Sequence, residues 1–147
     1  ARNWTFEVTE SSPIIDIAPS LSILTRLRLV GFKLAVDDFG TGTSNYERLL
    51  VAPFTELKID RALVRRLRAG ASRPDPMVRS SVEVGHSLGL RVIAEGIETI
   101  EQYRIIRDLG CDFAQGYLIS RPVSPSNFAE AITNWSDQRA SVLGSGS

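Results

Sequence analysis

Acidic side chains follow several apolar runs of this sequence at the points where those runs end. One run ends in the adjacent pair Asp37 and Asp38 and passes into a loop with two glycines, as LAVDDFGTGTSNY over residues 34–46. Adjacent carboxylates repel one another, so this pair needs a compensating charge. Four other runs end in a similar way: FEVTE carries Glu7 and Glu10, LKID carries Lys58 and Asp60, AEGIE carries Glu95 and Glu98, and AQG carries Gln115. Several converging carboxylates point to the binding of a divalent cation.

Alternating strands and helices would position these residues. Strand-like runs are TFEV, FKLAV, ELKI, RVIA and CDFAQGYLI, and helical patterns cover residues 14–30, 44–50, 77–88, 100–109 and 127–135. This alternation predicts an α/β fold with about five to six βα units and a mostly parallel sheet. Parallel strands bring their carboxyl ends to one rim, where α/β barrels assemble their active sites. We therefore expect the strand-end residues to meet there: Glu7, Asp37, Asp38 and Glu95, with Lys58 and Gln115 beside them.

The predicted donor set contains oxygen ligands only. Such a set favours Mg²⁺, Mn²⁺ or Ca²⁺ over zinc, and we expect His86 to be a packing or surface residue rather than a ligand. Metal ions at such a rim commonly activate water against a phosphoester, and a neighbouring lysine can orient that water or help to deprotonate it. Each residue also has an ordinary structural interpretation. Asp37 and Asp38 could cap a helix, and Lys58 could lie at the surface.

Composition limits the classes of partner. The chain has 147 residues, 43% of them hydrophobic, which suits one globular domain. It has no formal net charge, which argues against binding to a nucleic-acid polymer or to an anionic membrane. The single cysteine, Cys111, excludes an internal disulfide and suits a reducing compartment. Because no apolar run approaches the length of a membrane span, we expect a cytoplasmic domain without membrane insertion. We expect this domain to cover residues 1–137 and residues 138–147 to form a flexible tail.

The motifs VDDFGTG, LKID, VIAEGIE and GCDFAQGYLISRP, in this order, resemble the EAL family of bacterial phosphodiesterases, which open cyclic di-GMP to the linear dinucleotide. The resemblance extends from about Trp4 to about Trp135 and implies a partial TIM-like barrel. It also implies a role for each residue of the site. Glu7, Asp37 and Glu95 would bind Mg²⁺ or Mn²⁺, and Asp38 would bind a second metal or position its water. Lys58 would act on the nucleophilic water, and Gln115 would lie near the substrate.

The resemblance also implies roles around this site. Glu10 would steady the loop from Asp38 to Gly42, which includes Gly40 and Thr41 and which is linked in the family to dimerisation and metal affinity. Glu98 would lie behind the metal ligands. Arg121 and Pro122 would lie at the mouth of the barrel, near the substrate.

The sequence contains no EAL or EVL tripeptide, and the family segment with a metal-binding asparagine is also missing. The resemblance therefore implies a C-terminal portion of the domain that begins at the third strand, and we expect it to be weak or inactive alone. Two unpaired sheet edges, near FEVTE and CDFAQGYL, would favour a homodimer or a second chain that completes the barrel. Two alternatives stay open, a non-catalytic module that binds cyclic di-GMP or metal and a protein-interaction remnant.

Overall fold

A single parallel sheet organises the chain. The computed structural model describes residues 3–9, 17–40, 46–67 and 75–143. Five strands lie side by side in chain order, and each neighbouring pair is parallel. They are β1 (Thr5–Thr9), β2 (Lys33–Phe39), β3 (Glu56–Ile59), β4 (Arg91–Ala94) and β5 (Phe113–Ala114). The predicted α/β fold with a parallel sheet is confirmed.

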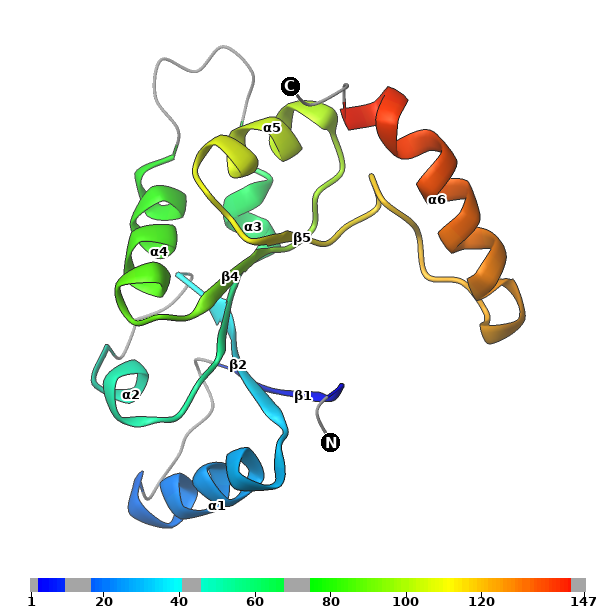
Figure 1. Ribbon diagram of the computed structural model, residues 1–147. Helices are drawn as coiled ribbons and strands as arrows, with labels where there is room; N and C mark the ends of the chain where they lie inside the picture. The colour runs from blue at the N-terminus through cyan, green and yellow to red at the C-terminus, as the bar shows by residue number, and fades with distance from the viewer. Residues whose placement is uncertain (1–2, 10–16, 41–45, 68–74, 144–147) are drawn as a thin grey trace.

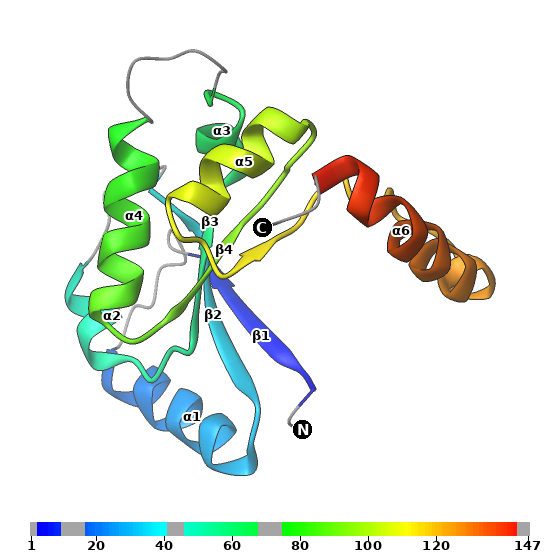
Figure 2. The same ribbon diagram turned by 45° about the horizontal axis from the view of Figure 1, so that its top comes forward.

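Helices alternate with the strands and cover one face of the sheet. They are α1 (Ile17–Val30), α2 (Tyr46–Val51), α3 (Arg61–Val64), α4 (Pro76–Ser87), α5 (Ile100–Asp108), a 3₁₀ turn η1 (Pro125–Asn127) and α6 (Phe128–Leu143). Figures 1 and 2 show α1, α2, α4 and α5 following one another along this face, whereas α6 stands beyond β5. Local signals explain two of the starts. Asp75 accepts a hydrogen bond from Met77 N–H at the start of α4, and Thr99 forms a capping box with Gln102 at the start of α5.

Two sequence predictions need correction. The run CDFAQGYLI is a strand only at Phe113–Ala114, because the chain turns at Gly116, whose carbonyl accepts a hydrogen bond from Ile119 N–H. The predicted tail is also too long, since α6 continues to Leu143 and residues 138–143 are helical. Among the described residues, no helix has both the length and the apolar character needed to cross a membrane.

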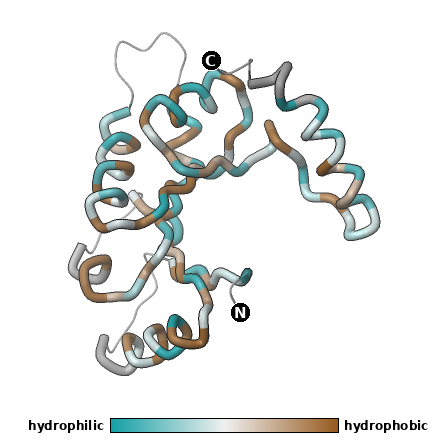
Figure 3. The backbone as a smooth tube through the Cα atoms, viewed as in Figure 1, coloured by the Kyte–Doolittle hydropathy of each residue, from teal (hydrophilic) through white to brown (hydrophobic). Residues whose placement is uncertain are grey.

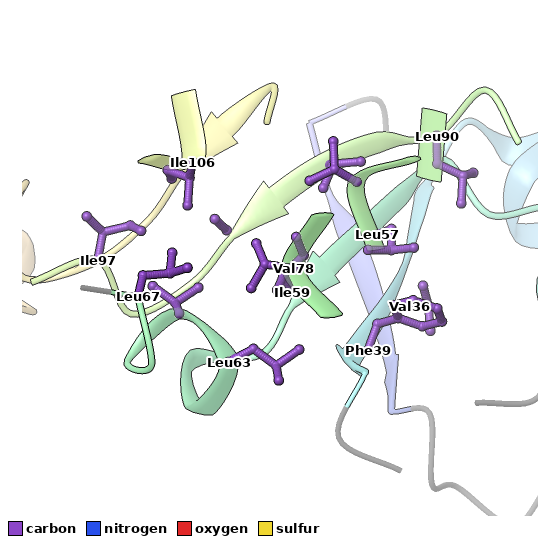
Figure 4. Close-up of a cluster of buried hydrophobic side chains, with 14 of the residues drawn as sticks. Val36, Phe39, Leu57, Ile59, Leu63, Leu67, Val78, Leu90, Ile97 and Ile106 are labelled. Atoms are coloured by element: carbon purple, nitrogen blue, oxygen red, sulfur yellow. The ribbon is translucent and has the colours of Figure 1, made fainter. Parts of the chain in front are cut away.

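The apolar core lies between the sheet and the helices that cover it. Hydrophobic bands recur along the strands and on these helices (Figure 3). The close-up in Figure 4 shows Val36, Leu57 and Ile59 of the sheet in one cluster with Val78 of α4 and Ile106 of α5. Because close packing fixes side-chain positions, this layer holds the strands in a defined register.

The central strand β3 has a different character on its two faces. All four of its residues are buried, and the sequence ELKI alternates charged and apolar side chains. Alternate residues of a strand point to opposite faces, so Leu57 and Ile59 enter the apolar core while Glu56 and Lys58 point to the other face. Two charged side chains are therefore buried on the face that the helices do not cover, and each needs partners there.

Candidate active site

Three carboxylates from three strands surround the ammonium group of Lys58. Lys58 Nζ lies 2.6 Å from Glu7 Oε1, 3.2 Å from Asp37 Oδ1 and 2.7 Å from Glu95 Oε1. The Lys58 side chain is only 7% exposed. The prediction that strand-end residues meet at one rim is confirmed for Glu7, Asp37, Glu95 and Lys58.

An irregularity of β2 places the paired aspartates. Val36 pairs with Leu57 and Phe39 with Ile59, so two residues of β2, Asp37 and Asp38, stand opposite the single residue Lys58. This is a β-bulge, which locally redirects side chains. Asp38 has a φ of 59°, a left-handed conformation that aspartate tolerates better than most residues. The bulge explains how the neighbouring carboxylates of Asp37 and Asp38 can contact different side chains.

The charged side chains of this site shift one another's pKa values. Burial alone lowers the pKa of Lys58, but the contacts with Glu7, Glu95 and Asp37 outweigh burial and raise its pKa above the ordinary value. Burial raises the pKa of Glu95, and the charges of Asp37 and Glu7 act in the same direction, while Lys58 opposes them. Lys58 is therefore a firmly held cation among carboxylates.

Asp38 faces a different neighbour from Asp37. Burial, the charge of Asp37 and a side-chain hydrogen bond with Asp60 raise the pKa of Asp38. Asp60 also accepts a hydrogen bond of 2.6 Å from Ala62 N–H and so begins α3. The sequence analysis noted Asp60 in LKID but gave it no role, and the structure places it against Asp38.

The segments after β4 and β5 bring Gln115 to the same rim. Ile97 N–H donates to Gln115 O at 3.0 Å, and Leu118 N–H donates to Ile97 O at 2.9 Å. A Cβ atom added at Gly116 would overlap the backbone of Ile97, so glycine permits this close approach. Glu95 and Gln115 share a cavity of about 370 Å³ with Arg61, Arg65, Gly96, Glu98, Gly116 and Tyr117.

The other predicted residues lie around this rim or outside the described residues. Glu98 forms an ion pair of 3.5 Å with Arg65. Arg121 and Pro122 line a second cavity of about 500 Å³ that also includes Gln115, and the Arg121 guanidinium stacks over the Tyr117 ring. Gly40 ends the described part of its loop, whereas Glu10, Thr41 and Gly42 fall outside it. His86 is exposed and contacts Asp112, as expected for a surface residue.

The carboxylate oxygens of this rim are donors of the chemical type that divalent cations prefer. Asp37 Oδ1 is buried and lies 3.2 Å from Lys58 Nζ. A buried carboxylate oxygen near the Glu7 and Glu95 carboxylates is a ligand of the type that Mg²⁺ and Mn²⁺ prefer. In the arrangement of the described side chains, no three Asp, Glu, His or Cys groups surround one metal position. The Lys58 ammonium stands where the carboxylates meet.

A second charged layer on the same face escaped the sequence analysis. Glu56 pairs with Arg91 and with Lys33, and it accepts a hydrogen bond from Thr5. Its only signal in the sequence is the alternation in ELKI. This Glu56 layer lies toward the amino ends of the strands. It has an anion at its centre, whereas the layer formed by Lys58, Glu7, Asp37 and Glu95 has a cation at its centre.

These features define a class of protein, an α/β domain in which carboxylates surround a cation at the carboxyl ends of parallel strands. The EAL domain family matches residues 1–122. The cyclic di-GMP phosphodiesterase RocR of Pseudomonas aeruginosa is 40% identical over 125 residues, which are 85% of this chain and 32% of RocR. The chain therefore belongs to the EAL domain family, and it spans about a third of that relative.

Solved structures show the same fold. The PaMucR phosphodiesterase in complex with cyclic di-GMP superposes with a TM-score of 0.76 at 40% identity, over 84% of this chain and 50% of that chain. The manganese and cyclic di-GMP complex of BlrP1 from Klebsiella pneumoniae gives a TM-score of 0.71 at 36% identity, over 80% of this chain and 30% of that chain. EAL domains are TIM-like barrels, and this chain has five of the parallel strands of such a fold.

Proposed function

We propose that this chain takes part in the hydrolysis of cyclic di-GMP to the linear dinucleotide. The observation that carries the proposal is the convergence of Glu7, Asp37 and Glu95 on Lys58 at the carboxyl ends of the strands. The family and the ligands of its solved relatives add the substrate, a cyclic dinucleotide. A phosphodiester is an anion, so an acidic site needs cations to receive it.

Glu7, Asp37 and Glu95 would hold Mg²⁺ or Mn²⁺, and Asp38 would lie beside a second metal position. Such a cation, when bound, would lower the pKa of water and would offset charge on the phosphodiester. The Lys58 ammonium donates hydrogen bonds at this point and would orient the water that attacks phosphorus. Gln115 would contact the substrate from the shared cavity, and Arg121 and Pro122 would border the substrate on its outer side.

Turnover of cyclic di-GMP with Mg²⁺ or Mn²⁺ tests this proposal. We expect only weak formation of linear product from the chain alone, and loss of that product on Asp37→Asn, which keeps the shape of the side chain and removes its charge. Asp108→Asn is the matched control, because Asp108 is exposed on α5 and pairs only with its neighbour Arg107 among the described residues. A folded chain that binds cyclic di-GMP without product would contradict hydrolysis and favour the binding module.

We also propose that another chain, or a second copy, covers the edges of the sheet. β1 and β5 are the edge strands, and each exposes a phenylalanine, Phe6 and Phe113. Unpaired edges with apolar side chains favour pairing with another strand. Light scattering after size exclusion tests this, and a monomer at micromolar concentration would contradict it. The single cysteine, Cys111, is the reason to place this activity in the reducing bacterial cytoplasm.

A further inference from the structure

A buried glutamine connects the segment after β4 to helix α3. Gln102 lies in the first turn of α5 and is only 6% exposed. Its Oε1 accepts hydrogen bonds from Glu98 N–H at 2.8 Å and from Thr99 N–H at 3.2 Å. Its Nε2 donates a longer hydrogen bond, of 3.5 Å, to the carbonyl oxygen of Val64, the last residue of α3. Because an amide carries an acceptor at one end and a donor at the other, this one side chain binds backbone groups of two separate segments.

The segment between β4 and α5 is fixed through its backbone. At its start, Glu95 N–H donates to Ile59 O at 3.2 Å. In its middle, Gly96 lies so close to α3 that a Cβ atom built on it would be 2.5 Å from Arg61 Cβ. At its end, two successive N–H groups donate to Gln102 Oε1. The first of these N–H groups is three positions after Glu95, so a movement at the Gln102 end reaches the Glu95 carboxylate.

The Glu95 carboxylate brings this segment into contact with the rim. Its Oε1 lies 2.7 Å from Lys58 Nζ, and the Lys58 side chain is buried. Charge-assisted hydrogen bonds of this kind have a narrow range of lengths, about 2.7–2.9 Å, so a small displacement of the segment weakens the contact. The ion pair between Glu98 and Arg65 also joins the segment to the chain after α3, but it is long and exposed and holds the segment only weakly. The Gln102 amide makes the buried connection.

We propose that Gln102 is a positioning residue for the rim, whose side-chain amide holds the segment after β4 against α3 and so keeps the Glu95 carboxylate on the Lys58 ammonium. A role in capping α5 accounts for only part of its contacts. The capping box needs the two hydrogen bonds between Thr99 and Gln102, but it needs neither the bond from Glu98 N–H nor the bond to Val64 of another helix. The effect on catalysis rests on the proposed function, whereas the effect on the position of Glu95 does not.

Two variants separate the positioning role from the capping role. Gln102→Met keeps an unbranched side chain of similar length and removes both ends of the amide. Thr99→Val is the matched control, because it keeps the branched shape and removes the hydroxyl that accepts a hydrogen bond of 3.2 Å from Gln102 N–H. It weakens the same helix start and leaves the Gln102 side chain in place. We expect both variants to unfold at a lower temperature than the wild type.

The ammonium signal of Lys58 in ¹⁵N NMR spectra reports on the rim without metal or nucleotide. Lys33 and Lys58 are the lysines of the chain, so the signal that remains in Lys33→Arg belongs to Lys58. Ion pairs slow the exchange of ammonium protons with water and keep that signal sharp. We expect a sharp signal in the wild type and in Thr99→Val, and a broadened or missing signal in Gln102→Met.

Turnover of cyclic di-GMP with Mn²⁺ gives a second comparison. In Gln102→Met we expect kcat to fall about tenfold or more with little change in KM, because displaced groups slow the chemical step rather than substrate binding. Thr99→Val should turn over cyclic di-GMP like the wild type.

Amide hydrogen exchange of the wild type does not depend on the folding of a variant. Glu98 N–H lies outside α5, and its acceptor is the buried Gln102 Oε1. We expect it to be protected as strongly as the amides inside α5. Rapid exchange of this amide in the folded protein would overturn the inference, and this measurement decides the question if Gln102→Met does not fold.

The outcomes separate this inference from the proposed function. Equal effects of Gln102→Met and Thr99→Val on the Lys58 signal and on kcat would overturn the inference and leave Gln102 as a helix cap. An unchanged Lys58 signal in folded Gln102→Met would overturn it as well. A wild type without turnover, in which only Gln102→Met broadens the Lys58 signal, would remove the hydrolysis and leave the positioning role standing.

Discussion

The close approach of Gly116 to Ile97 gives the most direct prediction from this structure. A Cβ at position 116 would overlap the carbonyl oxygen and the nitrogen of Ile97. Ile97 is completely buried, so its backbone cannot retreat without disturbing the core. In Gly116→Ala the chain after β5 must therefore move away from the segment after β4.

The expected cost follows from the contacts that this movement breaks. The hydrogen bonds from Ile97 N–H to Gln115 O and from Leu118 N–H to Ile97 O would be lost, at about 1 kcal/mol each. Overpacking in a filled core adds roughly 1 kcal/mol or more. We expect Gly116→Ala to lower the free energy of unfolding by about 3 kcal/mol. Gln115 would also shift away from Glu95.

Urea unfolding and amide hydrogen exchange measure these effects. The amides of Ile97 and Leu118 should lose protection in Gly116→Ala. Gly89→Ala is the matched control, because no atom lies within 4 Å of a Cβ built at Gly89. Its φ of 70° should cost about 1 kcal/mol through backbone strain alone. A loss of stability in Gly116→Ala no larger than in Gly89→Ala, with both amides still protected, would refute the reasoning.

Three further predictions concern residues outside the site. Glu56→Gln should lower the free energy of unfolding by about 2 kcal/mol, because Arg91 loses a buried carboxylate partner but stays partly hydrated. Urea titrations measure this change, and an unchanged unfolding midpoint would contradict it. Burial raises the pKa of Asp112, but the hydrogen bonds from Val92 N–H and from His86 outweigh it and lower that pKa. The charged Asp112 therefore stabilises the fold fully above pH ~4, its pKa when unfolded, and this contribution is lost as pH falls through the lower folded pKa; Asp112→Asn should cost about 1 kcal/mol at pH 7 and less in acid. Burial and the charge of Asp112 raise the pKa of Cys111 to about 12, so its reaction with a disulfide reagent at pH 7 should be at least about 100-fold slower than in the unfolded chain.

The sequence could predict the parts of this protein that depend on local order. The apolar runs and the turns between them predicted five strands, and all five are present in parallel, although the last is shorter than expected. Strand polarity then required Glu7, Asp37, Lys58 and Glu95 to share one rim, because parallel strands end on the same side. The motifs also identified the family. The roles of Asp38, Gln115, Arg121 and Pro122 stay predictions, since they depend on substrate and metal.

Only the tertiary structure decided how the charges meet. The bulge at Asp37 and Asp38 arises from the register of β2 against β3, which no local pattern specifies. The ion pairs of Lys58 join residues of three separate segments, and the Glu56 layer joins Thr5, Lys33 and Arg91 in the same way. Whether a charged residue of a strand is buried, and with which partner, depends on the distance between side chains after packing. Sequence therefore determined which residues reach the rim, and packing determined that an ammonium lies at its centre.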